Sequence, residues 1–328
     1  MDTDADGCAR VPEHDHVEEV VQLGRLSKHY RRPHRQLERQ YGLRRGILTG
    51  TDDIYERLKA SAERIETPFV DGNGRLVWWC WGEGPTLLML HGDYGSWTHF
   101  IRNIDALSER YRLIIPDMPG YASSDLPPLD DIVVDSSQML CDHLDTIIGA
   151  NENYDIVGFS FGGIYAGQMA TIHKDRIGTV VLIGTGGMGV DEAPHTRREM
   201  QRLSRDMDYE TRAAIHHNNL CGVMFARDET ADDLAILLQD ENTGRTRIRA
   251  RGIPESDVLF RAFPDCTARF TAIWGERDAY AVDAVPEREQ MLRNFYPDLD
   301  FRTIRGTGHW VMYEAPDAFN EIVLEMLA

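Results

Sequence analysis

Short apolar runs alternate with amphipathic segments over most of the chain beyond about residue 67. The runs that we expect to form strands are residues 75–84, 85–92, 111–117, 153–159, 177–186, 268–275 and 299–306. The helices expected between and after them are residues 96–110, 134–149, 161–173, 286–295 and 316–327. Strands that are apolar at nearly every position are typical of a parallel sheet covered by helices on both faces. The pattern therefore predicts an α/β protein.

The alternation stops over residues 188–265, which contain no strand-like run. Three helix-like stretches lie there instead, at residues 196–207, 209–220 and 230–242. We interpret this region as a helical cap inserted between two core strands, so that residues 67–187 and 266–328 together form the core.

Residues 1–66 are expected to form an N-terminal extension. Residues 1 to about 20 are acidic and almost free of large apolar side chains, which predicts disorder. Residues 51–66 are predicted to form an amphipathic helix, with Asp53 and Glu56 as a capping box and an apolar stripe at Ile54, Leu58 and Ile65. This stripe must cover an apolar surface of the body or of a partner subunit.

One motif carries chemistry. The run "GFSFGG" places Ser160 between Gly158 and Gly162, where a predicted strand gives way to a predicted helix. A sharp turn at that point would hold the serine in a strained backbone conformation with its hydroxyl exposed. Side chains at the two glycines would collide across such a turn, and the helix that follows would favour negative charge beside the serine.

This motif in its strand–turn–helix context resembles the nucleophile elbow of the α/β-hydrolase superfamily, over about residues 67–328. The resemblance implies a mostly parallel eight-stranded sheet with helices on both faces, a helical cap and a Ser–acid–His triad. The family's acid and histidine positions match Asp278 in "GERDAY" and His309 in "GTGHW". His309 would accept the proton of Ser160, and Asp278 would fix the imidazole tautomer. Glu276, two residues before Asp278, is a rival for the acid.

The resemblance also implies an oxyanion hole made by the backbone N–H groups of Phe161 and Asp93. Asp93 departs from the family pattern, because its carboxylate would oppose an oxyanion unless it turns away to a hydrogen-bond partner. His91 and Asp125 are expected to shape loops. The adjacent His216 and His217 point in different directions on a helix and lack ligands at metal spacing, so no metal site is predicted.

A substrate pocket is expected between the cap and the sheet, as in the family. Candidate pocket residues are apolar or aromatic and are equally compatible with a core role: Tyr94, Trp97, Met188, Met207, Met224, Phe225 and Trp310.

Composition and charge limit the classes of molecule that the protein is expected to bind. The formal net charge of −19 argues against nucleic acid and anionic membranes, and no apolar run is long enough to span a bilayer. Residues 28–45 are an exception, with seven Lys and Arg against one Glu. They favour a self-association arm, or an arm that lies over the acidic body of its own or a neighbouring subunit, and we expect a homo-oligomer. No secretory signal is recognised, and the five scattered cysteines favour free thiols in a reducing cytoplasm.

A serine at the elbow disfavours dehalogenases and epoxide hydrolases, which use aspartate there. We expect a cofactor-free enzyme that hydrolyses a hydrophobic ester or lactone. A general carboxylesterase and a C–C bond hydrolase are the alternatives on this fold, because their first steps are common. A non-catalytic ligand-binding protein is a further alternative, although such proteins typically lose the serine or the histidine.

Overall fold

The computed structural model describes residues 52–190, 194–204, 206–250 and 252–328. The predictions for the acidic N-terminal stretch and for the basic run at residues 28–45 lie outside these residues. The side chain of Asp53, and with it the predicted capping box, is also outside the described part.

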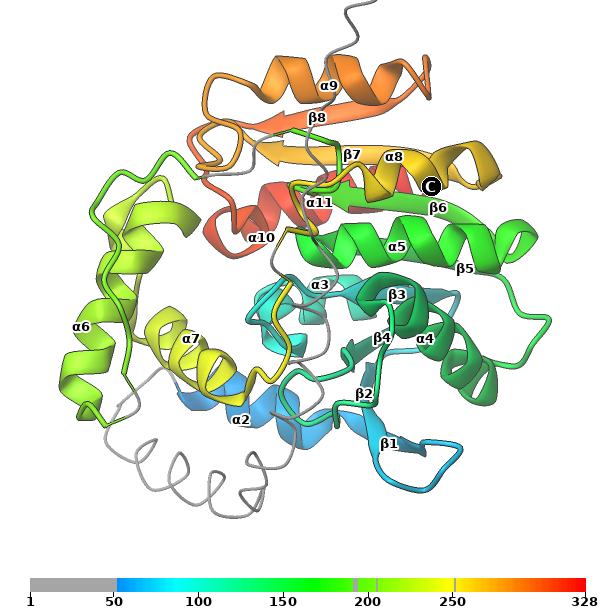
Figure 1. Ribbon diagram of the computed structural model, residues 1–328, viewed down its shortest axis with the longest axis horizontal. Coiled ribbons are helices and arrows are strands. Elements are labelled where there is room, and N and C mark those ends of the chain that lie inside the picture. Colours follow the sequence, from blue (N-terminus) through cyan, green and yellow to red (C-terminus); the bar gives the residue numbers. More distant parts are fainter. Residues whose placement is uncertain (1–51, 191–193, 205, 251) are drawn as a thin grey trace, which may run out of the picture. The chain divides into compact units, whose positions relative to one another are not determined.

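The described residues contain one eight-stranded sheet in the order β1-β2-β4-β3-β5-β6-β7-β8 (Figure 1). The strands are β1 (Glu63–Pro68), β2 (Arg75–Trp81), β3 (Thr86–Leu90), β4 (Arg112–Asp117), β5 (Tyr154–Phe159), β6 (Ile177–Ile183), β7 (Arg269–Gly275) and β8 (Asp300–Ile304). β2 is antiparallel to both β1 and β4, and all other neighbours are parallel. The predicted α/β fold with a mostly parallel eight-stranded sheet is confirmed.

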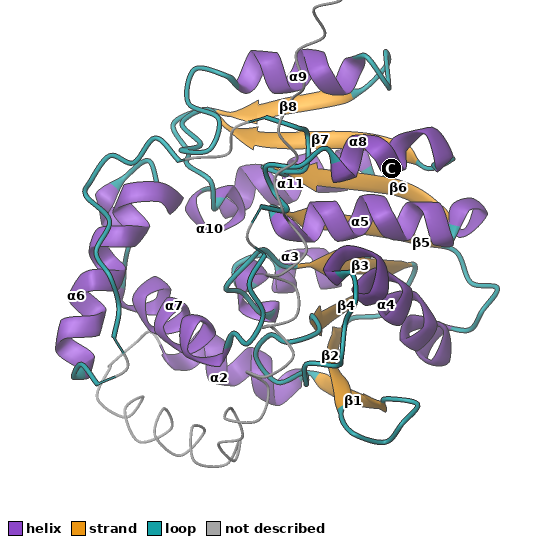
Figure 2. Ribbon diagram, in the orientation of Figure 1, coloured by secondary structure: helices purple, strands orange, loops and turns teal. Residues whose placement is uncertain are grey.

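Helices cover both faces of this sheet (Figure 2). The α-helices of the described part are α2 (Asp52–Ser61), α3 (Ile104–Ser108), α4 (Ile132–Ile148), α5 (Phe161–Ile172), α6 (Tyr209–Asn219), α7 (Asp233–Arg245), α8 (Val258–Ala262), α9 (Val285–Arg293), α10 (Val311–Glu314) and α11 (Pro316–Met326). One buried apolar cluster packs α4, α5, α8 and α9 on one face, and a second packs α2, α3, α10 and α11 on the other. Strands buried on both sides explain why their sequences are apolar at nearly every position.

The helix predicted at residues 51–66 is correct only in its first part. α2 ends at Ser61, and Glu63–Pro68 forms β1, whose Thr67 hydroxyl accepts a hydrogen bond from Trp78 Nε1 at 2.9 Å. The helix packs on the body of the same chain: Leu58 is buried, and its carbonyl accepts a hydrogen bond from Trp81 Nε1 at 2.9 Å. The apolar face of α2 is therefore already covered within the subunit.

Of two other predicted helices, one is wrong in part and one is wrong throughout its described residues. Residues 96–110 form a 3-10 turn at Trp97–Phe100 and the short α3 instead of one continuous helix. The described part of residues 196–207 is not helical. There the N–H of Arg197 donates to the carbonyl of Gly222 at 3.1 Å, and the N–H of Gln201 donates to Asn219 Oδ1 at 2.9 Å, so these backbone groups bond to distant residues instead of forming a local helix.

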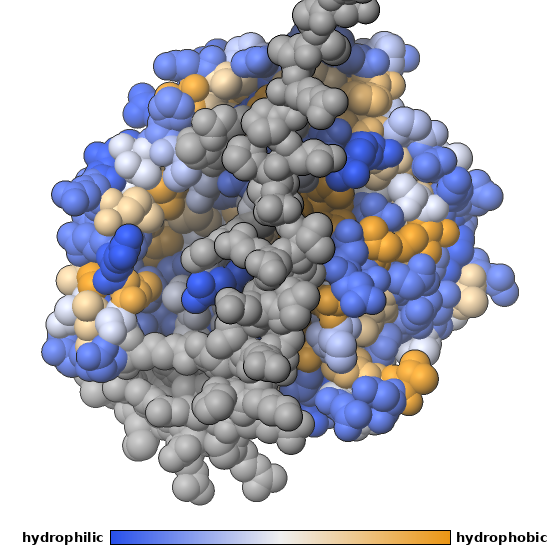
Figure 3. Space-filling view, in the orientation of Figure 1, coloured by the Kyte–Doolittle hydropathy of each residue, from blue (hydrophilic) through white to orange (hydrophobic). Residues whose placement is uncertain are grey.

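On the face shown in Figure 3, the visible described residues form a mainly hydrophilic surface with scattered small apolar areas. Cys80, Cys141, Cys221 and Cys266 are free thiols. Among the described residues, no helix is both long and apolar enough to cross a membrane.

Candidate active site

Ser160 occupies a strained turn between β5 and α5. Its φ and ψ angles are 51° and −116°, in a region that non-glycine residues rarely adopt. Its N–H donates to the carbonyl of Ile183 at 2.7 Å, which fixes the turn against the end of β6. Such a conformation costs about 1–3 kcal/mol and persists only where the surroundings impose it.

The flanking glycines are required by lack of space, as the motif predicts. A Cβ atom on Gly158 would lie 2.7 Å from the carbonyl oxygen of Gly162. A Cβ atom on Gly162 would lie 2.6 Å from the carbonyl oxygen of His91. Because real Cβ atoms do not approach so closely, any side chain at either position would displace the elbow.

His309 and Asp278 form a buried pair. Nδ1 of His309 lies 2.8 Å from Oδ2 of Asp278, and the two side chains are 5% and 1% exposed. Asp278 follows β7, and its other oxygen accepts the N–H of Tyr280 at 3.0 Å. Because a carboxylate only accepts, Nδ1 of His309 carries the proton and Nε2 presents a lone pair.

The carboxyl ends of the parallel strands bring this pair to the serine. The N–H of Ser160 donates to the carbonyl of Ile183, and Gly184 is the next residue along the chain. A Cβ atom on Gly184 would lie 3.0 Å from Oδ2 of Asp278 and 3.1 Å from Nδ1 of His309. The ring of Phe159, directly before Ser160, lies 4.9 Å from the His309 ring. His309 and Asp278 therefore lie close to the residues that flank Ser160, and the joint action of the three as a triad stays a prediction.

Glu276 faces a different partner. Its Oε2 accepts the N–H of Gly306 at 2.8 Å, and the residue is exposed. Glu276 therefore stabilises the turn at Gly306, and Asp278 is the acid that contacts His309.

One oxygen of the Asp93 carboxylate accepts two hydrogen bonds. Its Oδ1 accepts the Tyr121 hydroxyl and the N–H of Tyr94, each at 2.8 Å. Burial raises the pKa of Asp93, although both hydrogen bonds oppose that shift. Within the described residues, the N–H groups of Asp93 and Phe161 have no acceptor, so both remain available as donors. Their role as an oxyanion hole stays a prediction.

Two buried histidines shape the loop that carries Asp93. His91 Nδ1 donates to the carbonyl of Gly92 at 2.8 Å, and its Nε2 accepts the N–H of Met118 at 3.0 Å. Burial lowers the pKa of His91 to about 4 and the pKa of His99 well below its usual value. His99 Nδ1 accepts the N–H of Gly92 at 3.2 Å, a contact that the sequence did not predict. Both rings are held neutral, and their hydrogen bonds fix the backbone of the loop that carries Asp93.

The predicted pocket residues differ in their surroundings. Tyr94 is 41% exposed, and Met207 and Met224 are partly exposed. The other four are almost fully buried: Trp97, Met188, Phe225 and Trp310. Trp97 packs against the rings of Tyr55 and Trp81, and Trp310 stacks on Phe225. A substrate-binding role for the set stays a prediction, and in this conformation only the exposed members present surface to a ligand.

The remaining singled-out residues have structural partners. Asp125 Oδ2 accepts the N–H of Arg75 at 3.1 Å, which matches the predicted loop role. His216 is buried beside Asp240, with Nε2 3.3 Å from Oδ1, and His217 lies near the sulfur of Cys221. Each histidine of the pair therefore faces a different neighbour.

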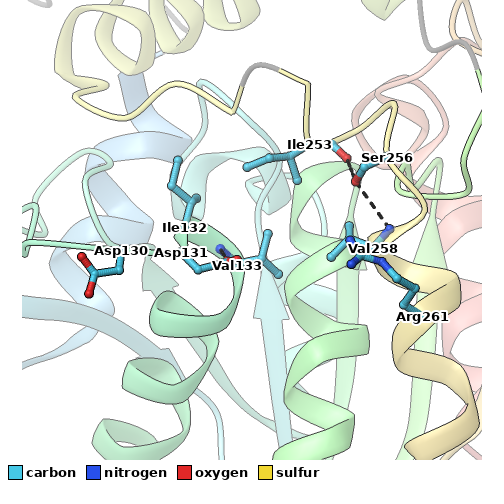
Figure 4. Close-up of a pocket in the computed structure, with 8 residues that line it drawn as sticks. All are labelled: Asp130, Asp131, Ile132, Val133, Ile253, Ser256, Val258 and Arg261. Carbon is cyan, nitrogen blue, oxygen red and sulfur yellow. Dashed lines mark hydrogen bonds between the residues drawn. The ribbon is translucent and has the colours of Figure 1, made fainter. Parts of the chain in front are cut away.

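A separate pocket of about 260 Å³ opens between the start of α4 and the loop before α8 (Figure 4). The residues that line it are Asp130, Asp131, Ile132, Val133, Ile253, Ser256, Val258 and Arg261. No member of the predicted triad lines this pocket, and the carboxylate of Asp131 is already bonded to the N–H groups of Val133 and Val134.

Comparison with known proteins agrees with this architecture. The sequence model of the Alpha/beta hydrolase family matches residues 87–322. A 2-hydroxy-6-oxo-6-phenylhexa-2,4-dienoate hydrolase of Burkholderia cepacia is 27% identical over 259 residues, which cover 75% of this chain and 89% of the relative.

Solved structures share the fold at lower identity. The esterase RhEst1 from Rhodococcus sp. ECU1013 superposes with a TM-score of 0.63 at 18% identity, covering 81% of this chain and 98% of the esterase. A mutant of the meta-cleavage product hydrolase CumD superposes with a TM-score of 0.56 at 22% identity, covering 80% of this chain and 97% of that hydrolase.

Proposed function

Since the chain belongs to the Alpha/beta hydrolase family, we propose that it cleaves acyl bonds through a covalent intermediate on Ser160. The observation that carries this proposal is the 2.8 Å contact between His309 Nδ1 and Asp278 Oδ2. That pair lies at the strand ends where Ser160 is held in its strained turn. A histidine oriented by a buried carboxylate, near a partly buried serine, is the set of groups that a serine hydrolase needs.

The reaction begins when Ser160 Oγ attacks the substrate carbonyl while His309 Nε2 takes its proton. Collapse of the tetrahedral intermediate breaks the ester bond, and the imidazolium returns the proton to the leaving alkoxide. A water molecule deprotonated by His309 then attacks the acyl-enzyme and releases the acid. Asp278 stabilises the imidazolium in both halves of the reaction.

The charge that develops on the carbonyl oxygen would be bound by the N–H groups of Phe161 and Asp93. Each such donor is worth about 3–4 kcal/mol of the barrier. Phe161 opens α5, so the positive end of the helix points to the same place. Hydrogen bonds from the Tyr121 hydroxyl and the N–H of Tyr94 to Oδ1 hold the Asp93 carboxylate in place and offset part of its opposition to this charge.

A hydrophobic lactone is the proposed substrate class. The set "GFSFGG", "GERDAY" and "GTGHW", together with a long N-terminal arm before a capped core, resembles bacterial zearalenone lactonases. Such an enzyme opens the macrocyclic ester of a fungal resorcylic acid lactone. The alcohol that leaves when the lactone ring opens stays tethered to the acyl group. Hydrolysis of the acyl-enzyme must therefore be faster than re-closure of the ring.

Hydrolysis of a C–C bond is the second candidate. It is favoured by the relative from Burkholderia cepacia, whose name describes hydrolysis of a dienoate with a 6-oxo-6-phenyl group. The triad is compatible with either reaction, since ester and C–C hydrolases share this fold.

A substrate panel separates the candidates. The purified chain would be incubated with p-nitrophenyl esters, zearalenone and 2-hydroxy-6-oxo-6-phenylhexa-2,4-dienoate, and products would be followed by absorbance and mass spectrometry. We expect the ring-opened acid from zearalenone, with no product from the Ser160→Ala variant. Intact zearalenone beside rapid turnover of the dienoate would reject the lactonase proposal in favour of C–C hydrolysis.

A further inference from the structure

Glu314 is a buried carboxylate that the proposed chemistry does not use. It is the last residue of α10, and its side chain is 0% exposed. Its oxygens accept the backbone N–H groups of Gly308 at 2.7 Å, Arg227 at 2.9 Å and Ala226 at 3.1 Å. The Arg227 guanidinium and the Thr230 hydroxyl lie at 3.3 Å. A buried charge is costly unless it is compensated in this way, so the position of this carboxylate is tightly defined.

The partners of Glu314 come from two distant parts of the chain. Gly308 immediately precedes His309. Ala226 and Arg227 belong to residues 224–227, which we call the cap stem. This segment begins at the last residue of Leu220–Met224, the continuation of α6. That continuation is a π-helical turn, a feature often found at functional sites. One carboxylate therefore joins the cap stem to the histidine loop.

The residue on the other side of His309 is bonded to the same stem. The N–H of Trp310 donates to the carbonyl of Met224 at 2.9 Å, and the Trp310 ring stacks on Phe225 at 5.6 Å and 11°. A Cβ atom on Gly308 would lie 2.6 Å from that Met224 carbonyl. Both neighbours of His309 are thus packed directly against the backbone of the cap stem.

α10 is also tied to the start of α7. The hydroxyl of Tyr313 donates to Asp232 Oδ1 at 2.6 Å, and Arg102 pairs with Asp232 Oδ2 at 2.5 Å. Asp232 in turn caps α7 by accepting the N–H of Ala235 at 2.9 Å. Adjacent residues of α10 therefore anchor two separate points of the cap.

We propose that Glu314 is a positioning residue that sets the place of the His309 imidazole by fastening the histidine loop to the cap stem. This inference rests on the proposed role of His309 as the base. Without the carboxylate, the N–H groups of Gly308 and Ala226 would lose their shared acceptor and the loop would shift. A displacement of about 1 Å in a reacting group can cost about 100-fold in rate.

The test compares E314Q with R227M, using full-length protein. E314Q keeps the shape but turns one acceptor oxygen into a donor that faces backbone N–H groups. R227M is the matched control, because it removes the guanidinium contact and leaves the backbone N–H donors in place. We expect kcat for p-nitrophenyl butyrate to fall about 10- to 100-fold in E314Q with little change in KM, and to stay within about twofold in R227M.

A second readout needs no substrate. The His309 Nδ1 proton that binds Asp278 should give a low-field proton resonance, assigned by its loss in H309Q. We expect this signal to shift or broaden in E314Q and to persist in R227M, while circular dichroism stays native in both. E314D, whose carboxylate is one methylene shorter, should show the same defects more weakly and is the fallback if E314Q does not fold.

The outcomes separate this inference from the proposed function. Native kcat and an unchanged low-field signal in E314Q would overturn the positioning role. Loss of folding in both E314Q and E314D would also overturn it, because Glu314 would then be a general stability determinant. Absence of ester turnover in the wild-type chain would reject the proposed ester chemistry alone, and the resonance comparison would still decide the role of Glu314.

Discussion

Nδ1 of His309 and Oδ2 of Asp278 lie 2.8 Å apart, although the two residues follow different strands of the sheet. Both side chains are buried, so the hydrogen bond is shielded from water and from salt. This contact fixes the tautomer of His309, and in the proposed mechanism the second ring nitrogen acts as the base for Ser160. The predictions below follow from this arrangement and from the groups that hold it.

Replacement of Asp278 tests which acid serves the histidine. In D278N the amide cannot stabilise the imidazolium and favours the wrong tautomer, so kcat should fall about 10⁴-fold. E276Q is the matched control, because Glu276 is exposed and binds Gly306 instead; its kcat should stay within about twofold. Steady-state ester hydrolysis measures both. Equal losses in the two variants would contradict the assignment.

Gly162 tests the steric basis of the elbow. G162A should lose detectable ester hydrolysis and about 1–3 kcal/mol or more of unfolding free energy, because its Cβ would overlap the His91 carbonyl. G222A is the control: the nearest atom to its Cβ is the sulfur of Met200, at 3.2 Å on a flexible side chain. Urea unfolding and activity assays should find G222A close to wild type. An active, stable G162A would show that the turn can relax.

The burial of Asp93 predicts that the difference in unfolding free energy between D93N and wild type depends on pH. Burial raises its pKa in the folded chain above the ordinary 3.8, so folding favours the protonated carboxyl. The contribution of Asp93 to stability is therefore greatest below pH 3.8 and is lost as the pH rises through the raised pKa. D93N can still accept from Tyr121 and Tyr94 but does not titrate.

Urea unfolding of D93N and wild type over a pH series measures this effect. The stability of D93N relative to wild type should increase as the pH rises from about 4 to 7. A difference that is constant over this range would contradict the burial of an ionisable Asp93.

The contribution of Asp240, on α7, to the unfolding free energy is expected to have the opposite pH dependence. Burial alone would raise its pKa, but hydrogen bonds from Arg212 at 2.7 and 2.9 Å and from His216 hold it at about 2. This contribution is present above pH 3.8 and is lost as the pH falls towards 2. D240N should therefore lose about 2 kcal/mol of unfolding free energy at pH 7.

The control for Asp240 is D233N, which removes an exposed charge from the same helix. Calorimetry at pH 7 should find a lower melting temperature for D240N and little change for D233N. Equal melting temperatures for D240N and wild type would show that the cluster of Arg212, His216 and Asp240 adds no net stability.

Local patterns were sufficient to predict the elbow and seven of the eight strands, whereas the eight-stranded sheet followed from the family resemblance. Ser160 could be recognised because its glycines and the change from strand to helix lie within a few residues of each other. The helix predicted over residues 196–207 failed because the N–H groups of Arg197 and Gln201 find long-range partners that local propensity cannot reveal. β1 was missed because its charged, half-exposed residues also fit the end of an amphipathic helix.

The groups that support the site were harder to predict. Glu314 and Tyr121 matter through partners far along the chain, and nothing in their sequence neighbourhood distinguishes them from an ordinary helix-terminal charge or a core aromatic. Glu314 lies five residues after His309, but this spacing acquires meaning only through the cap stem, whose backbone N–H groups bond to the same carboxylate in the folded chain.

The central claim is that Ser160 is a nucleophile activated by His309. The most direct test is covalent labelling of the protein by a p-nitrophenyl alkylphosphonate, with the adduct located by intact-mass and peptide mass spectrometry. We predict one phosphonyl adduct per chain on Ser160, none on S160A, and labelling slowed by about 100-fold or more in H309N. An absent adduct, an adduct on another residue, or an unchanged labelling rate in H309N would contradict the account.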